Sequence, residues 1–89
     1  YKRQGFIIMM LNVTNLEVRG IEEKLSGKTG KPYLIVRVED NHGAWVNLID
    51  RDISRKTLYE KGHFYNFALD LVIRMKYTSV SIIDVTLNE

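Results

Sequence analysis

The stretch YLIVRVEDNHGAWVNL, residues 33–48, carries the clearest structural pattern of the chain, because two alternating runs flank a short turn. The turn, residues 40–44, has the composition of a three-residue hairpin loop in which Gly43 adopts the left-handed conformation and forms a bulge. Such a loop pairs apolar residues with apolar residues across the two strands. The expected pairs are Val38 with Val46, Val36 with Leu48, and Arg37 with Asn47. The stretch therefore predicts an antiparallel hairpin with one buried face.

The rest of the chain predicts three more strands and a short helix. The expected elements are a strand over 11–25 with a bulge or bend at Gly20, a loop over 26–32, a short helix that is capped by Asp52 and ends at Gly62, a strand over 63–73, and a last strand over 79–87 with a kink near Asp84. This order is that of an all-β, five-stranded Greek-key barrel of the OB type. An SH3-like barrel is the nearest alternative.

The length of 89 residues supports one hydrophobic core. We expect residues 11–89 to form a single domain and residues 1–10 to be an N-terminal arm or a non-native remnant of expression. A domain this small that lacks cysteine gains buried area by oligomerising, which favours a homodimer. The absence of cysteine also fits a reducing cytoplasm, and the composition argues against a membrane span.

The sequence shows no constellation typical of catalysis or metal binding. The run Gly27-Lys28-Thr29 lacks the earlier glycine of a phosphate-binding loop, and a strand follows it. The two histidines lack a metal-ligand spacing, and no cysteine or serine has the context of a nucleophile. We interpret the acid pairs, including Asp50 with Asp52, as solvated surface groups. We therefore expect no enzyme activity, no cofactor and no metal.

Basic and aromatic residues converge on one predicted face and on the loops beside it. The net charge is only +2, but the segment from Lys24 to Lys31 contains three lysines and no acid. Single-stranded nucleic acid is bound by basic grooves that follow phosphates and by aromatic rings on which bases stack. The residues predicted to contact it are Tyr33, Arg37 and Trp45 on the face, Arg19, Lys28 and Lys31 beside it, and Arg74, Lys76 and Tyr77 before the last strand.

The same residues allow other interpretations. Tyr33 and Trp45 can simply cover one end of a barrel, and the lysines can serve solubility. A protein-interaction barrel would use an exposed strand edge or the aromatic face to dock a peptide. An RNA-binding OB domain would use the same kinds of side chain as a DNA-binding one.

One group of motifs resembles a known family. These motifs are Gly30-Lys31-Pro32-Tyr33 after a basic loop, Lys61-Gly62 before a strand, a later loop containing Tyr77, and the ending SIIDVTL, residues 81–87. Together they resemble the helix-destabilising single-stranded DNA-binding proteins of filamentous phages. The family's basic residue after the aspartate of the last strand is replaced here by Val85 and Thr86, and the loop around Tyr77 lacks the family's glycines.

The resemblance implies an OB fold and a dimer that coats single strands. It also implies that Tyr33 stacks on a base, that Lys31 meets a phosphate, and that Tyr77 reaches DNA bound to the other subunit. We therefore expect a protein that binds single-stranded DNA with little sequence preference, in the replication or transfer of a phage, plasmid or similar element.

Overall fold

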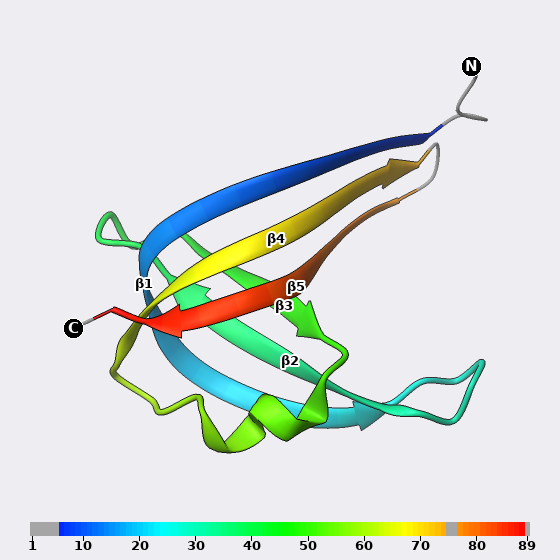
Figure 1. Ribbon diagram of the computed structural model, residues 1–89, viewed down its shortest axis with the longest axis horizontal. Helices are drawn as coiled ribbons and strands as arrows, with labels where there is room; N and C mark the ends of the chain where they lie inside the picture. Colours follow the sequence, from blue (N-terminus) through cyan, green and yellow to red (C-terminus); the bar gives the residue numbers. More distant parts are fainter. Residues whose placement is uncertain (1–5, 75–76, 89) are drawn as a thin grey trace.

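A computed structural model of the protein describes residues 6–74 and 77–88, and their strands form one closed barrel (Figure 1). The elements are β1 (Phe6–Leu25), β2 (Pro32–Glu39), β3 (Trp45–Asp50), the 3-10 helix η1 (Ile53–Thr57), β4 (Phe64–Arg74) and β5 (Thr78–Leu87). Around the barrel the strand order is β1-β2-β3-β5-β4. Neighbouring strands are antiparallel except β3 and β5, which are parallel. The expected all-β barrel of five strands with one small helix is confirmed.

The β2–β3 hairpin has the predicted register. Val38 pairs with Val46, Val36 with Leu48, and Arg37 with Asn47. In the turn the Asp40 N–H donates to the Ala44 carbonyl over 2.9 Å, and Gly43 has a φ of +88°. The Asp40 carboxylate accepts hydrogen bonds from the N–H groups of His42 and Ala44, and the bond from His42 is the main cause of its lowered pKa. The loop is thus the three-residue type expected, with Gly43 at the left-handed position.

Strand β1 begins earlier than expected and is bent twice. Residues 6–13 pair with β4, so residues 6–10 belong to the barrel sheet rather than to an arm. The register shifts between Val18 and Gly20, as the isolated glycine predicted, and it shifts again between Val13 and Leu16, where Asn15 has a φ of +62°. The two irregularities let one long strand pair with β4 along its first half and with β2 along its second.

Inward-facing side chains from every strand build the core. The buried residues are Leu16, Val18, Leu34, Val36, Val38, Leu48, Tyr59, Tyr65, Phe67, Leu69, Ile82 and Val85. The expected irregularity near Asp84 is also present, because Asp84 pairs with Ala68 and Ile82 with Leu69, which leaves Ile83 unpaired. This shift allows Ile82 and Val85, three residues apart, both to reach the core.

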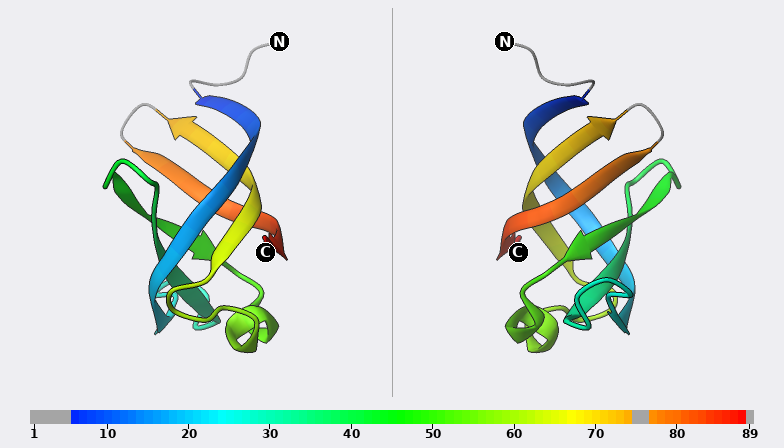
Figure 2. Two further views of the ribbon diagram at one scale, coloured as in Figure 1. Left: turned by 90° about the vertical axis from the view of Figure 1, so that its left-hand side faces the viewer. Right: turned by 90° about the vertical axis from the view of Figure 1, so that its right-hand side faces the viewer.

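Helix η1 lies at the lower end of the barrel, as both views of Figure 2 show. Asp52 caps it as expected, because its carboxylate accepts from the Ser54 N–H over 3.1 Å. The helix ends at Thr57 and not at Gly62. Gly62, with a φ of +88°, lies in the turn before β4 and donates its N–H to the Val18 carbonyl.

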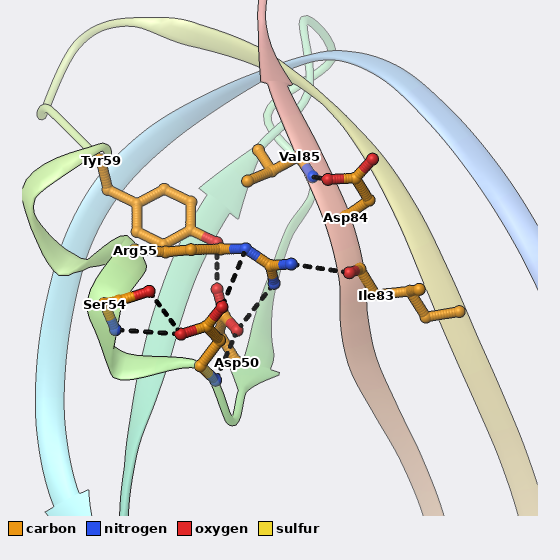
Figure 3. Close-up of polar contacts among 8 residues, drawn as sticks. Asp50, Ser54, Arg55, Tyr59, Ile83, Asp84 and Val85 are labelled. Carbon is orange, nitrogen blue, oxygen red and sulfur yellow. Dashed lines mark hydrogen bonds and ion pairs between the residues drawn. The ribbon is translucent and has the colours of Figure 1, made fainter.

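Asp50 is buried, which contradicts its interpretation as a solvated surface group. Its side chain has no exposed area and lies among residues of η1 and the segment that follows (Figure 3). The carboxylate accepts hydrogen bonds from Tyr59 Oη and Arg55 Nη1, and Arg55 Nη2 donates to the Ile83 carbonyl. Burial is tolerated because a cation and several donors satisfy the carboxylate.

Candidate nucleic-acid interface

Alternate residues of β2 and β3 form one outward surface, which we call the β2–β3 face. It contains Tyr33, Ile35 and Arg37 from β2 and Trp45, Asn47 and Ile49 from β3. The second half of β1 continues this surface, because Gly20 pairs with Arg37, Glu22 with Ile35, and Lys24 with Tyr33. Three of the residues predicted from the sequence therefore share one face, as the register required.

Arg37 and Trp45 are in direct contact on this face. The Arg37 guanidinium carbon lies 4.4 Å from the Trp45 ring centroid, which is the geometry of a cation–π contact. Arg37 Nε also donates to Asn47 Oδ1 over 3.4 Å. Trp45 is nevertheless 59% exposed. An aromatic ring that is both exposed and fixed in orientation is suited to stacking on a flat ligand.

A groove of about 420 Å³ runs beside Arg37. Gly20 faces Arg37 across the β1–β2 pair, and the space where a side chain would stand is open, so the missing side chain helps to form the hollow. The groove carries charges of both signs, and its lining residues are Arg19, Gly20, Ile21, Glu22, Lys24, Ile35, Arg37 and Asn47. The groove is open to solvent, which suits an extended polymer better than an enclosed small molecule.

Tyr33 lies toward the other end of the face and is half-buried. Its neighbour on β1 is Lys24. On the β3 side, Asp50 pairs with Leu34, and Arg51 follows Asp50 directly, just past the end of β3. Arg51 is exposed and forms no ion pair with any described residue. Arg51 is not among the residues predicted from the sequence, and it lies one residue beyond the alternating part of β3.

The loop between β1 and β2 presents Lys28 and Lys31 to solvent. Its ends are held by backbone bonds from Ser26 N–H to the Lys31 carbonyl and from Gly30 N–H to the Ser26 carbonyl, 2.9 and 2.8 Å long. The Ser26 hydroxyl also accepts from the Lys28 N–H. Neither lysine is ion-paired within the described part of the chain. Their charges are therefore available to a polyanion next to Tyr33.

Arg19, predicted to contact nucleic acid, lies between two carboxylates. It is the residue that the β1 bulge leaves unpaired, and it borders the groove. Its guanidinium forms ion pairs with Glu17 at 3.0 Å and Glu39 at 3.3 Å. The two carboxylates neutralise much of the charge that would attract a phosphate. Ion pairs this exposed stabilise a protein by only about 0–1 kcal/mol, so a strongly charged ligand can compete with them.

Arg74 is the last residue of β4 and Tyr77 directly precedes β5, with the Arg74 guanidinium carbon 5.7 Å from the Tyr77 ring centroid. Lys76 lies outside the described residues. In Figure 1 the end of β4 and the start of β5 lie at the upper right, whereas the β1–β2 loop lies at the lower right. Arg74 and Tyr77 thus contact each other but are not part of the β2–β3 face.

Within residues 6–74 and 77–88, no helix is long and apolar enough to cross a membrane. The same residues contain no group of three or more histidines and carboxylates that could hold a metal ion.

No protein-family model and no curated protein matches this chain. Solved structures do match it. One crystal form of Rim1, a mitochondrial single-stranded DNA binding protein from S. cerevisiae, has a TM-score of 0.72 and 15% identity, with 93% of this chain and 97% of that chain covered. A second form has a TM-score of 0.73 and 14% identity, with 93% and 98% covered. This chain has the OB fold. At such low identity the similarity establishes the fold alone.

Proposed function

We propose that this protein binds single-stranded DNA on the β2–β3 face, with bases stacked on Trp45 and Tyr33. The observation that carries the proposal is the exposed, Arg37-supported indole of Trp45 on the same strand face as Tyr33. Cations that have no ion-pair partner among the described residues flank the face, namely Lys28 and Lys31 in the loop and Arg51 after β3. The OB fold shared with Rim1, a mitochondrial single-stranded DNA binding protein, supports the same ligand.

The two kinds of contact have separate signatures. Stacking contributes about 1–3 kcal/mol for each base and tolerates any sequence, because every base has a π-face. Each phosphate neutralised by lysine or arginine releases counterions, and the logarithm of the affinity then falls with a slope of about 0.7 per contact against the logarithm of salt. We therefore expect weak sequence preference and strong salt dependence. Neither contact requires bond making or breaking, so the proposed role is binding without catalysis.

The test is a fluorescence titration that uses Trp45, the single tryptophan. We expect a thymine oligonucleotide to quench the emission more strongly at low than at moderate salt, and its duplex to quench little. Tyr33→Ala should weaken binding by about tenfold, since one stacked base is lost. Phe64→Ala removes an exposed aromatic ring from β4, away from the β2–β3 face, and should leave the affinity unchanged. The proposal fails if the single strand neither changes the emission nor forms a complex in a mobility assay.

We further propose that the protein is a homodimer joined through the first half of β1. Residues 6–13 pair with β4 on one side, and no described strand pairs with their other side. This edge exposes Ile8, Met9, Met10 and Leu11, and the segment 6–14 contains no charge. A long uncharged edge is a template for another strand. Antiparallel pairing of two copies would satisfy the free backbone hydrogen-bonding groups of both edges.

Met10→Lys should therefore shift the mass in sedimentation toward the monomer, because a charge on the edge opposes pairing. Leu25→Lys places the same charge at the other end of β1, at a residue of similar exposure, and should leave the mass unchanged. A monomeric wild-type protein at tens of micromolar concentration would contradict this assembly.

The biological setting is proposed from the sequence resemblance alone. Similarity to the filamentous phage proteins supports a cytoplasmic role in replication or transfer of a phage, plasmid or similar element. Because contacts to a 2′-hydroxyl distinguish RNA from DNA, titration with the matching ribo-oligonucleotide decides between the two ligands.

A peptide-docking role is the second candidate. It is favoured by an apolar hollow of about 210 Å³ at the barrel end, lined by Val13, Leu16, Val38, Asp40, Ala44, Trp45, Val46, Leu48 and Leu69. Binding at an apolar hollow depends weakly on salt, so a flat salt response would favour this candidate over nucleic acid.

A further inference from the structure

The contact between Arg37 and Trp45 assigns a role to Arg37 that its charge alone does not suggest. Trp45 is the first residue of β3 and follows the hairpin turn directly. The Arg37 guanidinium lies 4.4 Å from the ring centroid, while 59% of the Trp45 side chain remains exposed. Arg37 therefore covers part of the indole and leaves enough of the ring open for a second flat group.

A hydrogen bond to the neighbouring strand also holds the Arg37 guanidinium in place. Arg37 Nε donates to Asn47 Oδ1 over 3.4 Å, and Asn47 is the cross-strand partner of Arg37. No carboxylate pairs with Arg37 within the described part of the chain. The position of the guanidinium is thus set by one ring and one amide, neither of which carries a charge.

We infer that Arg37 is a positioning residue, which fixes the Trp45 indole as a preformed platform so that a nucleobase stacks on its open face and the guanidinium supports the other. This inference rests on the proposed binding of single-stranded DNA. In the stack of base, indole and guanidinium, Arg37 acts through its planar shape and its stacking, and it does not contact a phosphate.

The physical reason is the entropy of an exposed side chain. Ordering one rotamer-rich side chain on binding weakens affinity by about two- to tenfold, and a ring that is already ordered avoids this loss. A planar guanidinium stacks on an aromatic ring, whereas the lysine ammonium is a compact, strongly hydrated point charge that does not match the ring plane. Arginine and lysine therefore differ at this position although their charge is the same.

The decisive comparison is Arg37→Lys with Arg37→Ala, and Lys31→Ala serves as the variant that removes a proposed phosphate contact. Affinity for a thymine oligonucleotide is measured at four salt concentrations for each protein. We expect both Arg37 variants to weaken binding by about three- to tenfold with an unchanged salt slope. Lys31→Ala should reduce the slope by about 0.7, the value for one phosphate contact on a single strand.

A readout without DNA tests the geometry independently. Acrylamide should quench Trp45 more efficiently in both Arg37 variants than in the wild-type protein, because the covered part of the ring becomes accessible. The inference is overturned if Arg37→Lys binds like wild type, if Arg37→Ala reduces the salt slope as Lys31→Ala does, or if acrylamide quenching is unchanged. If the wild-type protein binds no single strand, the proposed function fails, and the inference fails with it.

Discussion

The Arg55 guanidinium donates from Nη1 to the fully buried carboxylate of Asp50 over 3.0 Å (Figure 3). The same guanidinium donates from Nη2 to the Ile83 carbonyl over 2.8 Å. One side chain of η1 thus joins the end of β3 to β5. This matters for the barrel because β3 and β5 share a single backbone pair, Ile49 with Ser81.

Replacing Arg55 by alanine should lower the free energy of unfolding by about 3–5 kcal/mol, since the buried Asp50 charge loses its cation. The measurement is urea unfolding followed by circular dichroism. Lys56→Ala is the control, because Lys56 pairs with Glu23 at the surface, and its loss should cost at most about 1 kcal/mol. Equal losses in the two variants would show that the Arg55 link does not hold the barrel closed.

Stability should fall in alkaline solution because of Tyr59. Burial first, and then its hydrogen bond to the Asp50 carboxylate, raise the pKa of Tyr59 well above its ordinary value of 10.0. Because the pKa of Tyr59 is higher in the folded than in the unfolded state, its contribution to the free energy of unfolding is complete below pH 10. Above pH 10 the Tyr59 hydroxyl of the unfolded chain loses its proton first, and the contribution decreases. Unfolding midpoints from pH 7 to 11 should therefore be flat and then drop above pH 10. Tyr59→Phe should be less stable at pH 7 and lose less above pH 10, and an equally steep drop would contradict the assignment.

Alanine at Gly43 should destabilise the β2–β3 hairpin by about 1–2 kcal/mol, the cost of placing a side chain in the left-handed region. Gly43 has a φ of +88°, and the site offers open space, so the cost is one of backbone conformation. Gly27→Ala is the matched control, because Gly27 also has open space but lacks a positive φ. Thermal unfolding should separate the two variants by several degrees, and equal melting temperatures would refute the explanation.

Arg51→Ala should weaken single-strand binding and reduce its salt slope by about 0.7, as expected for one lost phosphate contact. The prediction follows from the exposure of Arg51 and from its position directly after Asp50, the β3 residue that pairs with Leu34 next to Tyr33. Lys61→Ala removes another exposed cation that has no ion pair among the described residues, but it lies in the turn before β4 and off the β2–β3 face. Identical slopes for the two variants would indicate nonspecific attraction rather than a defined path.

Local patterns predicted the hairpin and the face correctly. The side-chain period of a strand is two, so the turn type set the pairing of Val38 with Val46 and placed Tyr33, Arg37 and Trp45 together. The bulge at Gly20 was predictable for the same reason, because a break in alternation is visible within a few residues. The role of these side chains in binding DNA stays a prediction.

The burial of Asp50 could not be predicted from the residues next to it in the sequence. The alternation of Val46, Leu48 and Asp50 already placed Asp50 inward, but its neighbour Asp52 and the polar sequence around it favoured a solvated group. Burial depends on Arg55 and Tyr59, which reach the carboxylate only after η1 folds against the end of β3. The ion pair between Arg19 and Glu39 also forms only in the folded barrel, because Glu39 lies on another strand.

The amino-acid sequence was enough to predict the order of the strands along the chain, the hairpin register and the identity of the outward face, because each follows from spacing over a few residues. The tertiary structure alone decided which charges are neutralised, that Asp50 is buried, that β1 continues back to Phe6, and that Arg37 covers Trp45. These features depend on distances between groups that different segments bring together. Such distances are set by packing and pairing across the whole barrel, and no local period encodes them.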